Sequence, residues 1–169
     1  MPIIQPYKGK HPVIHPSAFI ADNAVIIGDV TIGEEASVWY GCVIRGDVGD
    51  ITIGARSNIQ DLSMIHCTTD FKGTHVGDDV TIGHMAMLHA CDVHNGGFIG
   101  MGAIILDGAV VESKAMVAAG ALVTSHRIVK TRELWAGRPA TVLRELTDKD
   151  YKHMAWNSAH YVKLSREYL

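Results

Sequence analysis

The sequence predicts an all-β fold, a triangular coil of short parallel strands, followed by one C-terminal α-helix. Three observations support this class: aliphatic residues recur every six positions, small residues precede most of them by two positions, and glycine often follows them. A period of six fits neither the 3.6-residue helical repeat nor a long run of simple strand alternation. It does fit a coil with three flat sides of about six residues each, in which every aliphatic residue points inward.

The repeat runs through most of the chain, with a break after residue 65 and a one-residue slip after residue 88. Its inward positions are Ile14, Ile20, Ile26, Ile32, Val38, Ile44, Ile53, Ile59, Ile65, Val76, Ile82, Leu88, Val93, Ile99, Ile105, Val111, Val117 and Val123. A β-sandwich is the alternative, but its loops of varied length would destroy the strict period. Over residues 12–126 the pattern resembles the hexapeptide-repeat, left-handed parallel β-helix family, and the resemblance supplies the handedness.

The end of the chain lacks the repeat. We therefore expect residues 1–144 to form the β-helix with a short N-terminal lead-in, and residues 145–169 to form a helix packed on it. Thr147 followed by Asp150 is typical of a helix N-cap with an acidic residue three positions on. Apolar positions such as Tyr151 and Met154 follow. The segment 135–140 is interpreted as the turn that leads into this helix.

Composition excludes several function classes. Of the 169 residues, 47% are hydrophobic and 20% are charged, with a formal net charge of -3, so the basic surface of a nucleic-acid binder is missing. No apolar stretch reaches the ~18 residues of a membrane span, and the N-terminus lacks the design of a signal peptide. Three cysteines, Cys42, Cys67 and Cys91, are expected as free thiols in the core of a protein in a reducing compartment, the cytoplasm.

Histidines interrupt the repeat at positions that should point outward, because strand side chains alternate between faces. On one side of the coil, Arg45, His66 and His89 follow inward residues in successive turns. Gln60 and His84 fall on the preceding side, His84 close to its corner. Two stacked histidines stand about 5 Å apart at the backbone, which lets two imidazoles share one metal ion at about 2.0–2.1 Å.

His84 lies five positions before His89, so the two are separated by up to ~16 Å in an extended chain. One zinc cannot easily hold both from the same chain. It can hold them where copies of the chain meet side to side, and a closed three-fold ring makes this heterologous contact three times. We therefore predict a metal site made by His66 and His89 of one subunit and His84 of its neighbour, with water at the fourth position. The alternative is a set of histidines exposed on the coil without a metal.

Several motifs resemble the γ-class carbonic anhydrase family. They are Arg45-Gly46-Asp47, Asn58-Ile59-Gln60-Asp61, His66, the pair His84 and His89, and Gly100-Met101-Gly102. The resemblance implies a homotrimeric lyase in which Zn²⁺, with Fe²⁺ or Co²⁺ as other candidates, holds a water that attacks CO₂ as hydroxide to give bicarbonate. Such a metal lowers the pKa of its water toward ~7.

The resemblance also implies roles for other residues. Gln60 would orient the metal-bound water or bicarbonate, and Tyr161 of the terminal helix would reach the site. Arg45 and Asp47 would form salt bridges between subunits, with Asp61 as the partner across the interface. A purely structural ion pair is an equal alternative for Arg45 and Asp47.

The chain departs from this family where active members carry acidic proton shuttles. Val48-Gly49-Asp50 follows Asp47, and Cys67-Thr68-Thr69 follows His66, in place of an acidic loop and a glutamate. Fast CO₂ hydration needs a route for the proton released from water. Asp70 or His75 could substitute, but we interpret both as solvated loop residues.

Three functions are compatible with these observations. The first is a zinc-dependent CO₂ hydratase, favoured by three histidines at metal spacing. The second is an acyl-CoA thioesterase or acyltransferase, because hexapeptide proteins often transfer acyl groups with a single histidine as base. The third is a non-catalytic trimeric subunit in which the metal only clamps the interface. In each case the outward residues Trp39, Met85 and Met87 are expected to pack between subunits.

Overall fold

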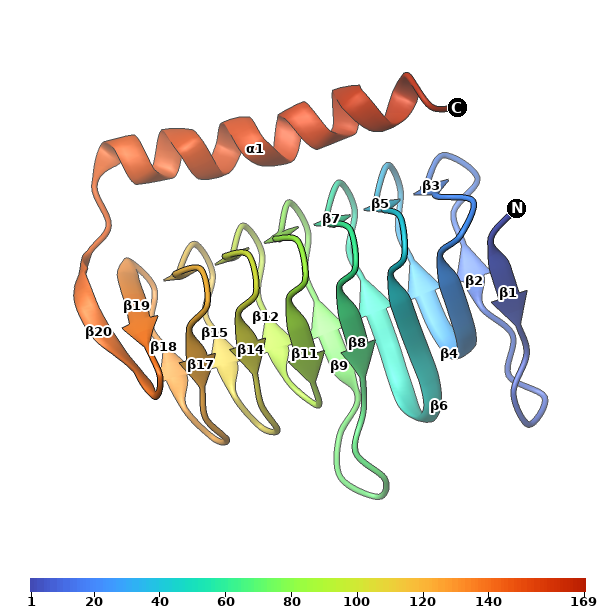
Figure 1. Cartoon of the computed structure of the whole chain (residues 1–169), viewed down its shortest axis with the longest axis horizontal. Helices are drawn as coiled ribbons and strands as arrows, with labels where there is room; N and C mark the ends of the chain where they lie inside the picture. The colour runs from blue at the N-terminus through green and yellow to red at the C-terminus, as the bar shows by residue number, and fades with distance from the viewer.

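The computed structural model describes residues 1–169 and consists of parallel strands stacked into a β-solenoid, with one α-helix lying along it (Figure 1). The predicted class, a parallel β-helix of hexapeptide repeats with a C-terminal helix, is confirmed. Each complete coil contributes one short stretch of strand to each of three sides. Equivalent stretches of successive coils pair in parallel, so the sides are flat ladders.

The three sides are named here by their strands. Side 1 comprises β1 (Ile3–Gln5), the first parts of β4 (Val25–Ile32) and β6 (Val43–Ile53), β8 (Met64–His66), β11 (Met87–His89), β14 (Ile104–Ile105) and β17 (Leu122–Val123). Side 2 comprises β2 (Val13–Ile14), the second parts of β4 and β6, β9 (Thr74–Val76), β12 (Asp92–Val93), β15 (Val110–Val111) and β18 (Ile128–Val129). Side 3 comprises β3 (Phe19–Ile20), β5 (Ser37–Val38), β7 (Asn58–Ile59), β10 (Thr81–Ile82), β13 (Phe98–Ile99), β16 (Met116–Val117), β19 (Glu133–Gly137) and β20 (Ala140–Glu145).

Inward side chains from the three sides form a single main core. On side 1, for example, Ile44 pairs with Ile65 and Ile65 with Leu88, and all three are fully buried. Burying one such side chain stabilises the fold by about 1.5–3 kcal/mol. The three cysteines are free thiols that belong to this core, as predicted. The six-residue period therefore arises because each coil must place one apolar side chain per side on the same axis.

The coil continues beyond the predicted end of the repeat. Val111 pairs with Val129 and Val117 with Trp135, so Val129 and the buried Trp135 occupy inward positions of a further coil. The interpretation of residues 135–140 as a turn into the helix is wrong, because β19 ends at Gly137 and pairs antiparallel with β20. An indole instead of an aliphatic side chain fills the last inward position, which is why the aliphatic pattern did not extend to it.

Coil length changes where the chain passes from side 1 to side 2. Ile26 pairs with Ile44 eighteen positions later, but Ile44 pairs with Ile65 after twenty-one positions and Ile65 with Leu88 after twenty-three. The extra residues lie at the corner between sides 1 and 2, in segments 46–50 and 67–73. The second segment projects beyond the other corners of the coil (Figure 1). The sides thus keep their register while this corner absorbs the insertions.

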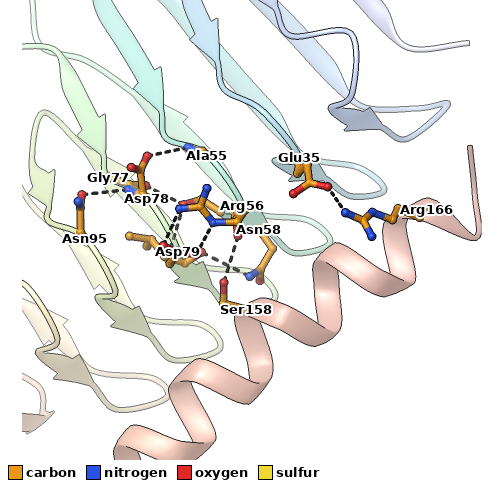
Figure 2. A network of polar contacts seen from close by, with 12 residues as sticks. Glu35, Ala55, Arg56, Asn58, Gly77, Asp78, Asp79, Asn95, Ser158 and Arg166 are labelled. Carbon is orange, nitrogen blue, oxygen red and sulfur yellow. Dashed lines mark hydrogen bonds and ion pairs between the residues drawn. The ribbon is translucent and has the colours of Figure 1, made fainter.

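The helix α1 (Asp148–Arg166) begins as predicted, with Thr147 as N-cap and a reciprocal hydrogen-bonded box between Thr147 and Asp150. It runs back along the coil, so its C-terminal end lies near the N-terminal coils (Figure 1). Figure 2 shows two polar ties that hold it: Ser158 Oγ donates to the carbonyl of Arg56 at 3.2 Å, and Arg166 pairs with Glu35. The helix is not apolar enough to cross a lipid bilayer.

Side 3 is the face that α1 covers, and this corrects one prediction. Trp39 was expected between subunits, but only 4% of it is exposed, and its ring packs against Phe19 and, in a T-shaped contact at 5.4 Å, against Tyr161 of the helix. An outward residue on side 3 therefore meets the chain's own helix. Met85, by contrast, is 61% exposed at the corner between sides 3 and 1.

Candidate metal centre

His66 and His89 form a close pair at the end of side 1. They occupy equivalent positions of β8 and β11, because the register pairs the two residues directly. His66 Nδ1 lies 3.1 Å from His89 Nε2, and the ring centroids are 5.2 Å apart. Both side chains are partly buried at the corner between sides 1 and 2. The parallel register alone thus brings two imidazoles from residues 23 positions apart into contact.

The other nitrogen of each ring is hydrogen-bonded to a carboxylate. His66 Nε2 lies 2.9 Å from Asp47 Oδ1, and His89 Nδ1 lies 2.8 Å from Asp107 Oδ1. An ionised carboxylate only accepts hydrogen bonds, so each ring carries its proton on the nitrogen that faces the carboxylate. In neutral rings, the two nitrogens that face each other therefore both carry lone pairs.

Two lone pairs at 3.1 Å repel each other unless a proton or a metal cation lies between them. Two ligands of a tetrahedral zinc, each about 2.0–2.1 Å from the metal, are separated by about 3.3 Å. The observed separation is close to this value, and neutral imidazole is a preferred zinc ligand. The pair, with its carboxylate partners, therefore has the chemistry of two ligands of one metal ion.

The carboxylates around this pair stay ionised at neutral pH. Burial alone raises the pKa of Asp47, but hydrogen bonds from His66 and Arg45 outweigh that effect, and the net pKa is lower than usual. Burial likewise raises the pKa of Asp107, and hydrogen bonds from Thr68 and His89 lower it by more. Arg45 Nη1 pairs with Asp47 Oδ2 within the chain. Asp47 therefore binds both an arginine and a histidine of side 1.

His84 lies at the other edge of side 1, at the corner between sides 3 and 1. Its Nδ1 is 2.9 Å from Asp61 Oδ2, and its Nε2 has no partner. β11 begins three residues after His84 and ends at His89, so the strand itself separates the two histidines. Within one chain, no group of three or more His, Cys, Asp or Glu side chains could hold a metal ion. No third imidazole of the same chain therefore joins His66 and His89 in such a group.

Gln60 and Tyr161 lie toward the His84 corner and make no bond to His66 or His89 of their own chain. Gln60 is buried on side 3, where its Nε2 donates to Asn58 Oδ1 at 3.0 Å. Tyr161 packs on Trp39, and burial raises the pKa of its phenol, with the nearby charge of Asp61 adding to the effect. The predicted residues thus form two groups on opposite edges of side 1.

Exposed apolar residues lie at and beside the His84 corner. We call Leu62, Met64, Met85 and Met101, which are between 41% and 64% exposed, the apolar rim. Leu62 and Met85 also have φ angles of 62° and 59°, in the left-handed region. At the equivalent corner of other coils the chain has Gly41, Gly102 and Gly120, which adopt this conformation without steric cost. Bulky side chains replace glycine in the two coils that contain the paired histidines and His84.

Comparison with known proteins identifies the family. A profile of the bacterial transferase hexapeptide (six repeats) matches residues 11–46. A carbonic anhydrase from Geobacillus kaustophilus is 49% identical over 98% of this chain and 91% of its own length. A mitochondrial gamma carbonic anhydrase of Arabidopsis thaliana is 44% identical over 93% of this chain. The chain belongs to the γ-carbonic anhydrase family. It spans only 58% of the length of the Arabidopsis protein.

Solved structures with the same architecture bear transferase names. A putative acetyltransferase from Bacillus cereus superposes on this γ-carbonic anhydrase family member with a TM-score of 0.96, at 45% identity over 99% of this chain and 96% of its own. A hexapeptide transferase family protein from Anaplasma phagocytophilum gives a TM-score of 0.95 at 48% identity, over 99% and 98% of the two chains. The coil and its helix are therefore shared by proteins that carry both kinds of name.

Two features of this family member were not anticipated from sequence. His75 is not a solvated loop residue: it lies in β9, with Nδ1 3.0 Å from Asp92 and Nε2 2.9 Å from Asp50. Asp107 and Thr68, which contact His89, were not singled out. The available signal for Asp107 was an acidic residue two positions after inward Ile105, one coil beyond His89.

Proposed function

We propose that this chain is the subunit of a homotrimeric, zinc-dependent γ-carbonic anhydrase that interconverts CO₂ and bicarbonate. One observation carries the proposal: a ring nitrogen of His66 and one of His89 face each other 3.1 Å apart, while a carboxylate lies within hydrogen-bond distance of the other nitrogen of each ring. This arrangement calls for a cation between the two rings. The activity itself is inferred from family membership.

The third ligand in this proposal is the partner subunit's His84. A closed three-fold ring brings the corner between sides 3 and 1 of each copy to the corner between sides 1 and 2 of the next. His84 Nε2 has no partner within the chain, so it is available there. His66, His89 and the partner subunit's His84 would hold Zn²⁺, or Fe²⁺ or Co²⁺ in its place, and the metal would supply the Lewis acidity that lowers the pKa of a water toward ~7.

Other residues of the chain would act on the water and the substrate. Gln60 uses Nε2 to bond Asn58, so its Oε1 can accept a hydrogen bond from water. Tyr161, like any phenol with a pKa near 10 or above, is protonated at neutral pH, so it can donate a hydrogen bond, and burial raises its pKa further. Arg45 bonds Asp47 through Nη1 and has other donors left for bicarbonate or for Asp61 of a neighbouring copy.

The apolar rim supports the trimer. A bulky residue in the left-handed conformation costs about 1–2 kcal/mol more than one in a right-handed conformation. Contiguous exposed apolar surface commonly marks an interface between proteins. Contact of Leu62 and Met85 with another copy would offset that cost and bury this surface, next to the two edges that must meet to complete the metal site.

A complementation experiment tests the shared site. His84→Ala and His89→Ala are each expected to lose zinc and CO₂ hydration. When the two variants are co-expressed with different tags and mixed trimers are isolated, a ring that contains both has one interface with all three histidines. We expect zinc of about one ion per mixed trimer and a partial return of hydration measured by stopped flow. His94→Ala, which removes an exposed histidine of side 2, is the matched control and should change neither quantity.

Several results would contradict the proposal. A shared site is wrong if the mixed trimers bind no zinc while the wild type binds three ions. The enzymatic part is wrong if zinc-replete wild-type trimers hydrate CO₂ no faster than buffer, an outcome that leaves a metal-clamped structural subunit. Metal analysis of protein purified without added zinc identifies which ion the site selects.

An acyl-CoA thioesterase or acyltransferase is the second candidate function. The transferase names of the structural relatives favour it, and so does a cavity of about 510 Å³ between α1 and the coil. Its walls include Tyr151, Met154 and Val162 on the helix and Lys114 on the coil, so an apolar chain with an anionic end would fit. An assay of acyl-CoA thioester hydrolysis separates the two functions. The free thiol that hydrolysis releases is measured for the wild type and for His89→Ala.

A further inference from the structure

Asp107 lies on the corner between sides 1 and 2, one coil beyond His89. One carboxylate oxygen is 2.8 Å from His89 Nδ1, and the other accepts a hydrogen bond from the hydroxyl of Thr68. We propose that Asp107, held in place by Thr68, is a positioning residue that fixes the tautomer and the orientation of His89 for metal binding. The inference rests on the proposed function, because it assigns a role at the same site.

The tautomer follows from the chemistry of the contact. A carboxylate has no proton to give at neutral pH, so the proton between His89 Nδ1 and Asp107 resides on the imidazole. A neutral imidazole carries only one proton, so Nε2 keeps its lone pair. That lone pair is directed toward His66, whose Nδ1 is 3.1 Å away. Metal-binding histidines commonly donate their second ring nitrogen to a carboxylate in this way.

Thr68 makes the carboxylate a fixed acceptor rather than a mobile one. Its hydroxyl binds Asp107 Oδ2 and also lies 3.4 Å from His89 Nδ1, so it touches both members of the pair. With both oxygens occupied, the carboxylate cannot turn away from the imidazole without breaking one of the two contacts. Thr68 therefore acts on His89 through Asp107.

The inserted segment 67–73 supplies this hydroxyl. Thr68 lies at its base, where it pairs with Lys72 in an isolated antiparallel bridge. Farther along the segment, the ring of Phe71 stands edge-on to His126 at 6.0 Å. The segment therefore folds toward the later coils, where Asp107 and His126 lie. A coil of eighteen residues has no such segment. The longest coil, which contains His66, therefore supports His89 of the next coil through this insertion.

A second histidine–aspartate pair of the chain offers a control with the same chemistry outside the site. His75 Nδ1 is 3.0 Å from Asp92, but its Nε2 is also 2.9 Å from Asp50. Both nitrogens of His75 face carboxylates, so neither nitrogen is directed at a second imidazole. Asp92→Asn removes a carboxylate from His75 on side 2 and from Lys72 of the inserted segment, but Asp92 has no direct contact with His66, His89, Thr68 or Asp107.

The test measures the tautomer of His89 and the affinity of the trimer for zinc. Long-range ¹H–¹⁵N NMR of the metal-free protein should show the Nδ1–H form of His89 in the wild type and a shift toward the Nε2–H form in Asp107→Ala. Competition with a chromogenic chelator should show zinc binding about 10–100-fold weaker in Asp107→Ala. Thr68→Val should change both quantities in the same direction but by less, and Thr68→Ser and Asp107→Asn, which keep a hydroxyl and an acceptor, should recover most of the loss.

The outcomes separate this inference from the proposed function. If wild type and Asp92→Asn bind zinc equally and Asp107→Ala matches them in affinity and tautomer, the positioning role is wrong. If the wild type binds no zinc, the proposed function fails, and an unchanged His89 tautomer in metal-free Asp107→Ala would overturn the positioning role as well. If Asp107→Ala does not fold, the zinc affinities of Thr68→Val and Thr68→Ser are compared instead. The proposal requires weaker binding in Thr68→Val, which lacks the hydroxyl, and equal affinities would overturn it.

Discussion

At the scale of single residues, the site depends on which nitrogen of each imidazole is protonated. His66 and His89 use opposite nitrogens toward their carboxylates, and this opposite choice turns the remaining lone pairs toward each other. Neither choice follows from a residue's place in the repeat. It depends on whether the acceptor lies in the preceding coil, as Asp47 does, or in the following one, as Asp107 does.

We expect turnover to be limited by proton release. The carboxylates that contact the facing histidines, Asp47 and Asp107, are kept ionised by hydrogen bonds, and His75 is held between Asp50 and Asp92. We therefore expect none of these groups to take up the proton released from water. Raising the concentration of imidazole buffer at constant pH and ionic strength should therefore raise the turnover number several-fold without a matching change in KM. Stopped-flow hydration at a series of buffer concentrations measures this, and a rate that is independent of buffer would contradict it.

The cysteine thiols should be unreactive in the folded protein. Burial raises the pKa of Cys42 and of Cys67 to about 11, and burial raises that of Cys91 further. At pH 8 almost no thiolate is present, and thiolate is the reactive form. Ellman's reagent should release less than one equivalent over minutes from native protein and about three after denaturation. Fast reaction of the native protein would contradict core placement. A reducing location remains a prediction that rests on these free thiols.

Sequence reasoning at this scale found the facing pair and missed its surroundings. Arg45, His66 and His89 were placed in one column because strand alternation and a constant inward position determine which residues point outward. Asp107 left a signal in its place one coil beyond His89, but Thr68 was out of reach, since its contact with Asp107 depends on how an inserted segment folds across 39 positions. His75 was misjudged for the same reason: the break in the repeat hid where β9 begins.

At the scale of elements, the helix depends on its first turn. Thr147 accepts a hydrogen bond from the backbone of Asp150, and Asp150 accepts one from the backbone of Thr147. Thr147→Ala should lower the free energy of unfolding by about 1 kcal/mol, because it leaves a helix N–H without a partner. Chemical denaturation followed by circular dichroism at fixed protein concentration checks this. Thr147→Ser keeps the acceptor and should be close to wild type.

The same turn should make the helix sensitive to acid. A hydrogen bond from Arg144 is the largest cause that lowers the pKa of Asp150, and the backbone and hydroxyl of Thr147 add to it. A carboxylate whose folded pKa is depressed stabilises the fold above its ordinary pKa near 3.9, and the stabilisation is lost as pH falls through the folded value. Asp150→Asn should therefore be less stable than wild type at pH 7, and the gap should narrow as the pH falls below about 3.9 toward 2. An equal gap at both pH values would contradict this.

The elements themselves were largely predictable. The six-residue period predicts the three sides of the coil, and the N-cap pattern predicts where α1 begins. Val129 continues the six-residue period, but the last coil was missed because its next inward position is Trp135 instead of an aliphatic residue. Trp39 was misplaced because the sequence does not indicate which side the helix covers, a choice made by aromatic packing of Phe19, Trp39 and Tyr161 between distant segments.

At the scale of the whole molecule, Leu62 discriminates between a solitary coil and an assembly. In an isolated chain, Leu62→Gly removes an exposed side chain and relieves a left-handed backbone, so it should be neutral or slightly stabilising. In the proposed trimer it removes an apolar contact beside the shared site, so it should weaken association about tenfold or more and lower zinc content. Analytical ultracentrifugation over a dilution series measures whether Leu62→Gly weakens association of the trimer. An unchanged trimer would rule out the rim as interface.

The insertions at a single corner have a consequence for engineering. Because every coil closes its own triangle, a foreign peptide spliced into segment 67–73 should leave the ladders of all three sides undisturbed. The three strand ladders should therefore stay intact when the corner between sides 1 and 2 accepts an insertion. This corner is the one that carries His66 and His89. An inserted peptide could place new functional side chains beside the paired histidines without any change to the buried core.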